Sequence, residues 1–126
     1  MKTNIIILLL LFALTFSVNL ASAEANSHKV IKVIDGDTVY IDFNDNGIPE
    51  QNEKVRINGI DTFETKLNDS LEWQMKLYGL SQDKALGLGY YGKEFAKKEL
   101  LNKPVRAEYT AEEKFDKNNR HLMSLY

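Results

Sequence analysis

Alternating apolar and polar residues run through the first half of the chain and predict β-strands there. Three stretches of this kind cover residues 29–34, 38–43 and 54–60. Asp35-Gly36, between the first two stretches, is a strong signal for a tight hairpin turn. A polar loop over residues 44–53 separates the second stretch from the third. We therefore expect three consecutive strands of one sheet.

In the second half, apolar residues recur at helical spacing. We interpret residues 67–89, which mix aromatic side chains, charges and glycines, as a short helix followed by a mobile loop. A clearer helix is predicted over residues 91–101, ending before Pro104. Its apolar stripe consists of Tyr91, Phe95, Ala96 and Leu100. Two more strands are predicted, over residues 105–110 and 122–126.

This order of elements predicts an α+β fold that is mainly β. It fits a five-stranded Greek-key barrel of the oligonucleotide-binding (OB) type with one helix. The last predicted strand is incomplete at Tyr126, and no C-terminal helix is expected to cover the barrel. We expect Trp73, Tyr90 and Tyr91 to pack in the core or in loops, with base stacking as the alternative.

Residues 1–23 have the features of a secretory signal peptide: Lys2, an apolar stretch and a small-x-small cleavage site at Ala21-Ser22-Ala23. We expect a secreted or periplasmic domain over residues 24–126, without stable membrane association after cleavage. An uncleaved anchor helix is the alternative. The chain has no cysteine, so packing or a bound metal must stabilise the domain. A formal net charge of −2 argues against a broad basic surface for nucleic acid.

Three carboxylates follow predicted strands: Asp37, Asp61 and Glu64, with Arg56 just upstream. Carboxylate oxygens suit a hard cation such as Ca²⁺, a spare carboxylate can activate water, and an arginine can hold a phosphate. The odd spacing of Arg56 and Asp61 points them to opposite faces of a regular strand. If they share a site, the chain must bend between them, and Asn58-Gly59 is the expected place.

A second metal-binding pattern spans residues 42–53. It matches the calcium-loop spacing D-x-[DN]-x-[DN]-G-x₅-E, with oxygen ligands from Asp42, Asn44, Asn46 and Glu53. However, strands flank this loop where calcium loops of this kind have helices. A structural calcium ion and a plain solvated loop are left as equal alternatives.

The run Ile34-Asp35-Gly36-Asp37-Thr38-Val39, followed by residues 55–66 (VRINGIDTFETK), resembles the staphylococcal nuclease (thermonuclease) family. Residues 91–96 and 115–120 are similar to the family's first helix and to the loop before its fifth strand. The resemblance covers roughly residues 29–66 and 90–126, with an insertion-like stretch between them. The combination is specific, whereas Asp-Gly-Asp-Thr alone would be weak.

The resemblance implies a calcium-dependent nuclease that hydrolyses phosphodiester bonds of DNA and RNA, preferably single-stranded or denatured, as a monomer. The implied calcium ligands are the carboxylates of Asp37 and Asp61 and the backbone carbonyl of Thr62. Glu64 is the implied general base, and Arg56 and Arg120 the implied phosphate contacts.

The sequence also departs from the family pattern. Phe63 replaces a usual proline, and Asn118 stands where a tyrosine often stacks on the base. The family's C-terminal helices have no counterpart, so we interpret the chain as C-terminally truncated.

Other interpretations stay open. Asp37 can simply close a turn, the acidic residues of 61–64 can cap a helix, and Arg120 can be a solvated charge. A non-catalytic barrel that binds nucleic acid or protein, or an inactive truncated fragment, is the alternative to a nuclease.

Overall fold

The structure is a computed structural model that describes residues 26–126. The predicted signal peptide over residues 1–23 lies outside the described residues. The elements, in chain order, are β1 His28–Val33, β2 Thr38–Asp42, the 3-10 turn η1 Gln51–Glu53, β3 Lys54–Ile57, α2 Asp69–Tyr78, α3 Gln82–Leu100, β4 Pro104–Val105, β5 Ala107–Glu108 and β6 His121–Leu125.

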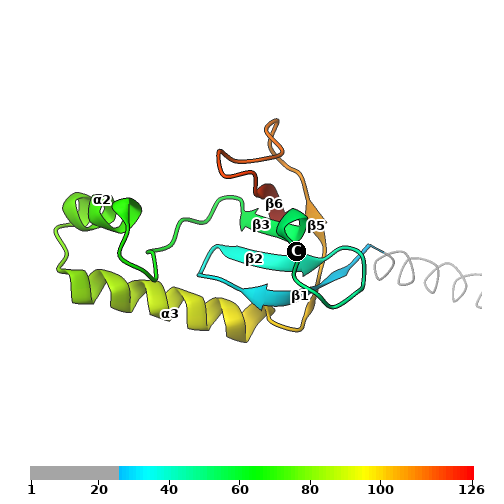
Figure 1. Cartoon of the computed structure of the whole chain (residues 1–126), viewed down its shortest axis with the longest axis horizontal. Coiled ribbons are helices and arrows are strands. Elements are labelled where there is room, and N and C mark those ends of the chain that lie inside the picture. The colour runs from blue at the N-terminus through cyan, green and yellow to red at the C-terminus, as the bar shows by residue number, and fades with distance from the viewer. Residues whose placement is uncertain (1–25) are drawn as a thin grey trace, which may run out of the picture.

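The strands form one mixed sheet in the order β4-β1-β2-β3-β6-β5 (Figure 1). β1, β2 and β3 pair antiparallel, as the hairpin signals predicted, whereas β3 and β6 are parallel. β4 pairs with β1, and β5, two residues further on, pairs with β6. The segment 104–108 thus joins both edges of the sheet and nearly closes it into a barrel. The predicted α+β barrel of OB type is confirmed, with the predicted fourth strand interrupted at Arg106.

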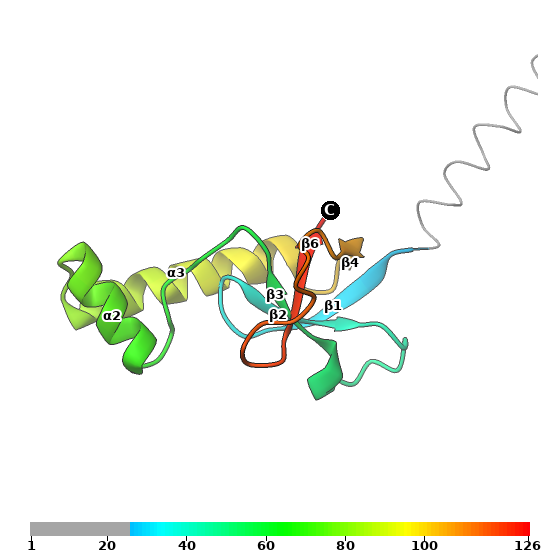
Figure 2. The same ribbon diagram turned by 90° about the horizontal axis from the view of Figure 1, so that it is seen from above.

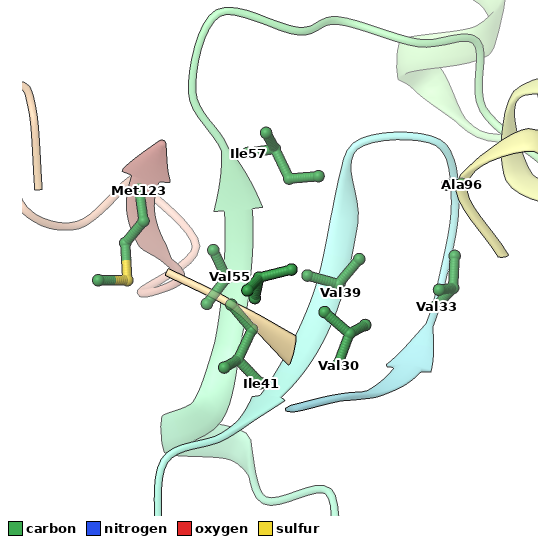
Figure 3. Close-up of a cluster of buried hydrophobic side chains, with 9 residues drawn as sticks. Val30, Val33, Val39, Ile41, Val55, Ile57, Ala96 and Met123 are labelled. Atoms are coloured by element: carbon green, nitrogen blue, oxygen red, sulfur yellow. The ribbon is translucent and has the colours of Figure 1, made fainter. Parts of the chain in front are cut away.

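The core consists of the inward-facing side chains of the strands (Figure 3). Val30, Val39, Ile41 and Val55 are completely buried. Alternation accounts for this along β2 and β3, whereas β1 has an irregularity in its register between Val30 and Lys32. α3 contributes Ala96 to this cluster, and Leu100 packs against it. Only the C-terminal end of α3 therefore covers the barrel.

The helical part is larger than predicted. Asn68 caps α2 by accepting a hydrogen bond from the Leu71 N–H at 2.8 Å, and Gly79, at φ 64°, ends it. α3 then begins at Gln82, so the stretch expected to be a mobile loop is helix. None of the helices within residues 26–126 has the length and apolar character needed to cross a membrane.

The predicted apolar stripe of α3 is wrong in its first half. Tyr91 and Phe95 are exposed, whereas Ala96 is buried. The physical reason is length: α3 has 19 residues and runs past the end of the barrel to α2 (Figure 2). Its first turns meet α2 and the chain between β3 and α2, and not the barrel core.

Candidate active site

The hairpin turn between β1 and β2 presents Asp37 at the mouth of a cleft. The Asp37 N–H donates to Asp35 Oδ1 at 3.2 Å, and the Ile34 N–H donates to the Thr38 carbonyl at 2.9 Å. Asp37 is 6 % exposed, and its Oδ1 accepts a hydrogen bond from the Thr38 hydroxyl at 2.9 Å. This buried carboxylate needs further partners, because an unpaired buried charge is costly.

Arg56 on β3 supplies one of these partners and joins Asp37 to Asp61. Its Nη1 forms an ion pair with Asp37 Oδ2, and its Nη2 donates to Asp61 Oδ1 at 2.9 Å. The chain leaves β3 at Ile57 and reverses at Gly59, whose φ of 80° favours glycine. The bend predicted at Asn58-Gly59 therefore exists, and it brings Asp61 back to Arg56.

Residues 61–64, called the site turn below, bind Asp37 from the other side. The backbone N–H and the hydroxyl of Thr62 both donate to Asp37 Oδ2, at 2.9 and 3.0 Å. One oxygen of the Glu64 carboxylate, Oε2, accepts a hydrogen bond from the Asn68 side-chain amide at 3.2 Å. The site turn thus brings Asp61 and Glu64 to the same cleft that Asp37 lines.

Gln74 on α2 fixes the site turn. Its Nε2 donates to the Thr62 carbonyl at 3.0 Å, and its Oε1 accepts from the Glu64 N–H at 3.2 Å. Gln74 is 6 % exposed, so these bonds are partly shielded from water. Gly89 on α3 supports the same turn, because a Cβ there would lie 2.2 Å from the Glu64 carbonyl oxygen. Gly89 falls in the stretch that was expected to end in a mobile loop, and in the structure it allows close packing.

The charged side chains at the cleft shift one another's pKa values. Burial raises the pKa of Asp37, but the Thr62 N–H and the Arg56 charge outweigh burial and hold that pKa below its usual value. Burial and the Asp37 charge raise the pKa of Asp35 from 3.8 to about 6. Burial lowers the pKa of Arg56, but Asp37 and Asp61 reverse this effect and raise it. Asp37 and Arg56 therefore stay ionised at neutral pH.

Arg120 reaches the same cleft from the end of the loop before β6. The parallel pairing of β3 and β6 places this loop beside Thr38, whose Oγ1 accepts from Arg120 Nη1 at 3.2 Å. Asp116 holds the guanidinium through Nε and Nη2, both at 2.6 Å. Burial raises the pKa of Asp116, but hydrogen bonds from Arg120 and Asn118 outweigh burial and lower it. Arg120 is thus an oriented cation and not a solvated charge.

These side chains line one cleft of about 590 Å³. Five carboxyl groups and three cationic side chains surround it. They include three residues that the sequence analysis did not select: Asp35, Asp69 and Lys117. Trp73 and Gln74 of α2 also line it. No motif marks these two residues, because α2 falls in the insertion-like stretch.

Within residues 26–126, no group of three or more His, Cys, Asp or Glu side chains forms a metal site. The geometry around Asp37 nevertheless fits a cation, because Arg56 already bridges Asp37 and Asp61 with its positive charge. The two carboxylates beside it are donors that hard divalent ions prefer, whereas the Thr62 carbonyl accepts a hydrogen bond from Gln74.

The loop over residues 42–53 lies at the other end of β2 and does not line this cleft. The Asp42 carboxylate accepts from the N–H groups of Asn46 and Gly47, at 3.0 and 2.9 Å. Asn44 accepts from the Asn46 N–H at 3.0 Å, and the buried Glu53 from the Phe43 N–H at 3.0 Å. All four predicted ligands sit in this loop, and its calcium binding stays a prediction.

A scan against protein-family models finds no match. Searches of known proteins find an uncharacterized protein of Methanocaldococcus jannaschii, 40 % identical over 103 residues, or 78 % of this chain and 47 % of that protein. The thermonuclease of Staphylococcus hyicus is 34 % identical over 110 residues, 84 % of this chain and 52 % of that enzyme. The thermonuclease of Staphylococcus intermedius is 35 % identical over 107 residues, with shares of 85 % and 52 %.

The chain thus spans about half the length of the relatives it matches. By sequence and by fold, the chain belongs to the staphylococcal nuclease-like family.

Proposed function

We propose that this protein is a calcium-dependent nuclease that hydrolyses phosphodiester bonds of DNA and RNA. One observation carries the proposal: the acids Asp37, Asp61 and Glu64 and the cations Arg56 and Arg120 line a single cleft. The family relationship supports it, since two relatives are named thermonucleases. A cleft that gathers acids and arginines suits an anionic substrate that must be bound and attacked by water.

Calcium would be held by the carboxylates of Asp37 and Asp61 and by the Thr62 carbonyl. When bound, it would offset the negative charge that builds up on the phosphate during displacement. The carboxylates that line the cleft outnumber its cations, so a phosphodiester entering alone would meet net repulsion. This imbalance is a physical reason for a divalent ion in the proposed reaction.

Glu64 would take the proton from the attacking water. Its carboxylate accepts one side-chain hydrogen bond, from Asn68, and lines the cleft, so its second oxygen can accept a proton. Arg56 and Arg120 would donate to the equatorial phosphate oxygens, which suits their planar donor groups. Arg120 is oriented for this by Asp116.

The proposed substrate is preferably single-stranded or denatured nucleic acid, as the family resemblance implies. We also propose that a secreted or periplasmic monomer carries out this reaction, in line with the features of residues 1–23.

The test is cleavage of denatured DNA in calcium, compared with the same reaction in a chelator. The parent protein should cut only with calcium, and Glu64→Gln should lose most of the rate, on the order of 10²–10⁴-fold for a positioned base. Glu72→Gln, an exposed acid on α2 outside the cleft, is the matched control and should cut normally.

Parental rates in Glu64→Gln would reject the assigned base. A folded parent protein that binds DNA without cutting it would favour the non-catalytic binding module. Circular dichroism separates that result from an unfolded fragment.

A further inference from the structure

Trp73 is the only tryptophan of the chain, and it is 59 % exposed. The expectation that it packs in the core or in a loop is therefore wrong. Leaving a large aromatic side chain largely in water forgoes the stabilisation that its burial would give. Such exposure has a use where a ligand covers the ring, and Trp73 lines the cleft that holds Glu64 and Arg120.

The position of the indole is set by α2. Asp69, Ser70 and Trp73 lie on one helical face, one turn apart, and all three line the cleft. The neighbouring face is anchored, because Leu71 is completely buried and Gln74 binds both Thr62 and Glu64. The backbone at Trp73 is therefore held at a fixed place relative to the site turn.

The indole has no partner of its own. Within residues 26–126, its side chain makes no hydrogen bond, ion pair or ring contact. Both the ring face and the Nε1–H donor are thus available to a ligand. Across the cleft lie Lys117, Asn118 and Arg120, none of which offers an aromatic surface.

We infer that Trp73 is a stacking platform for a nucleobase of the bound strand, next to the phosphate held by the arginines. This inference rests on the proposed function, because it takes the ligand to be a nucleic acid. A flat, neutral indole beside phosphate-binding cations matches a nucleotide, whose base stacks while its phosphate pairs with charge. Stacking accepts every base, so the platform adds affinity without sequence preference.

Because Trp73 is the only tryptophan, the intrinsic fluorescence of the protein reports on this platform directly. The probe is a thymidine dinucleotide, titrated with calcium into the Glu64→Gln protein so that the probe survives. A dinucleotide analogue that lacks both bases but keeps the phosphate is the control. Fluorescence should be quenched by the dinucleotide and not by the abasic analogue.

Kinetics on denatured DNA give a second readout. Trp73→Ala should raise KM about tenfold, in the range expected for one stacked base, and change kcat little. Trp73→Phe keeps an aromatic face and should recover most of the affinity. Because the Trp73 side chain is exposed, both variants should have the same melting temperature as the parent protein. If Trp73→Ala fails to fold, the KM of Trp73→Phe tests the platform instead.

Equal quenching by the abasic analogue, no quenching at all, or a parental KM in Trp73→Ala would overturn the platform. Fluorescence that changes with protein concentration alone would overturn it too, in favour of a self-association face. The two proposals fail separately. Base-dependent quenching in a protein that never cuts DNA would reject the nuclease proposal and support the stacking platform. DNA cleavage without base-dependent quenching would support the nuclease proposal and reject the platform.

Discussion

Gln74→Met removes the two hydrogen bonds that connect α2 to the site turn while keeping the length of the side chain. The Thr62 carbonyl and the Glu64 N–H lose their partners at 3.0 and 3.2 Å. An unsatisfied buried backbone group costs about 1–3 kcal/mol, and water can reach part of this cleft, so we expect a loss of roughly 2 kcal/mol in total. Opening of the site turn should then become about 30-fold more frequent, since 1.4 kcal/mol is a factor of ten.

Hydrogen exchange of the Glu64 amide measures this opening directly and does not depend on any assumed activity. The amide should exchange about 30-fold faster in Gln74→Met, and urea denaturation should show a free energy of unfolding lower by roughly 2 kcal/mol. On denatured DNA, kcat should fall because Glu64 is less often in position. Gln82→Met, an exposed glutamine at the start of α3, is the matched control and should leave all three measurements unchanged. Unchanged exchange at Glu64 in Gln74→Met would refute the claim that Gln74 holds the turn.

Gly89→Ala should destabilise the fold by about 1–3 kcal/mol in urea denaturation, since its Cβ would lie 2.2 Å from a site-turn carbonyl, whereas Gly87→Ala, with nothing within 4 Å, should be neutral or stabilising. Asp35→Asn should raise the free energy of unfolding by about 1–2 kcal/mol at pH 8 in calcium-free buffer, after a discount for solvent screening. The sign follows from the pKa of Asp35, which is raised from 3.8 to about 6 in the folded protein beside Asp37. Ionised Asp35 therefore destabilises the fold fully above pH 6, and the stability gained by Asp35→Asn should vanish near pH 4, where Asp35 is protonated. In calorimetric calcium titrations, Glu53→Gln should remove one of two bound ions, and a parent protein that binds a single ion would contradict the loop prediction.

The strands were predictable because their signals are local. Val39, Ile41 and Val55 alternate with less buried residues, and the alternation of a strand buries every second side chain. Asp35-Gly36 marks the hairpin, and Gly59 supplies the bend that returns Asp61 to Arg56. Each of these features depends on a few consecutive residues, which is why the sequence predicted the barrel and the place where the chain bends between Arg56 and Asp61.

The helical region was harder to predict because its environment is not local. The glycines of α3 resemble loop residues, yet Gly89 is required by a carbonyl some 25 positions earlier in the chain. Tyr91 and Phe95 follow a helical stripe, yet α3 runs past the barrel and leaves them exposed. Periodicity indicates which residues share a face but not which partner that face meets.

The sequence alone determined the OB-type barrel, its strand order through β3, and three of the five acids and both arginines of the cleft. The reason is that alternation, turn chemistry and motif spacing act over short stretches of chain. Only the tertiary structure decided that Gln74 is hydrogen-bonded to the site turn, that the Trp73 side chain is exposed in the cleft and that Asp116 orients Arg120. These contacts join segments whose distance in space is set by the packing of α2, α3 and β6, and no local pattern encodes that distance.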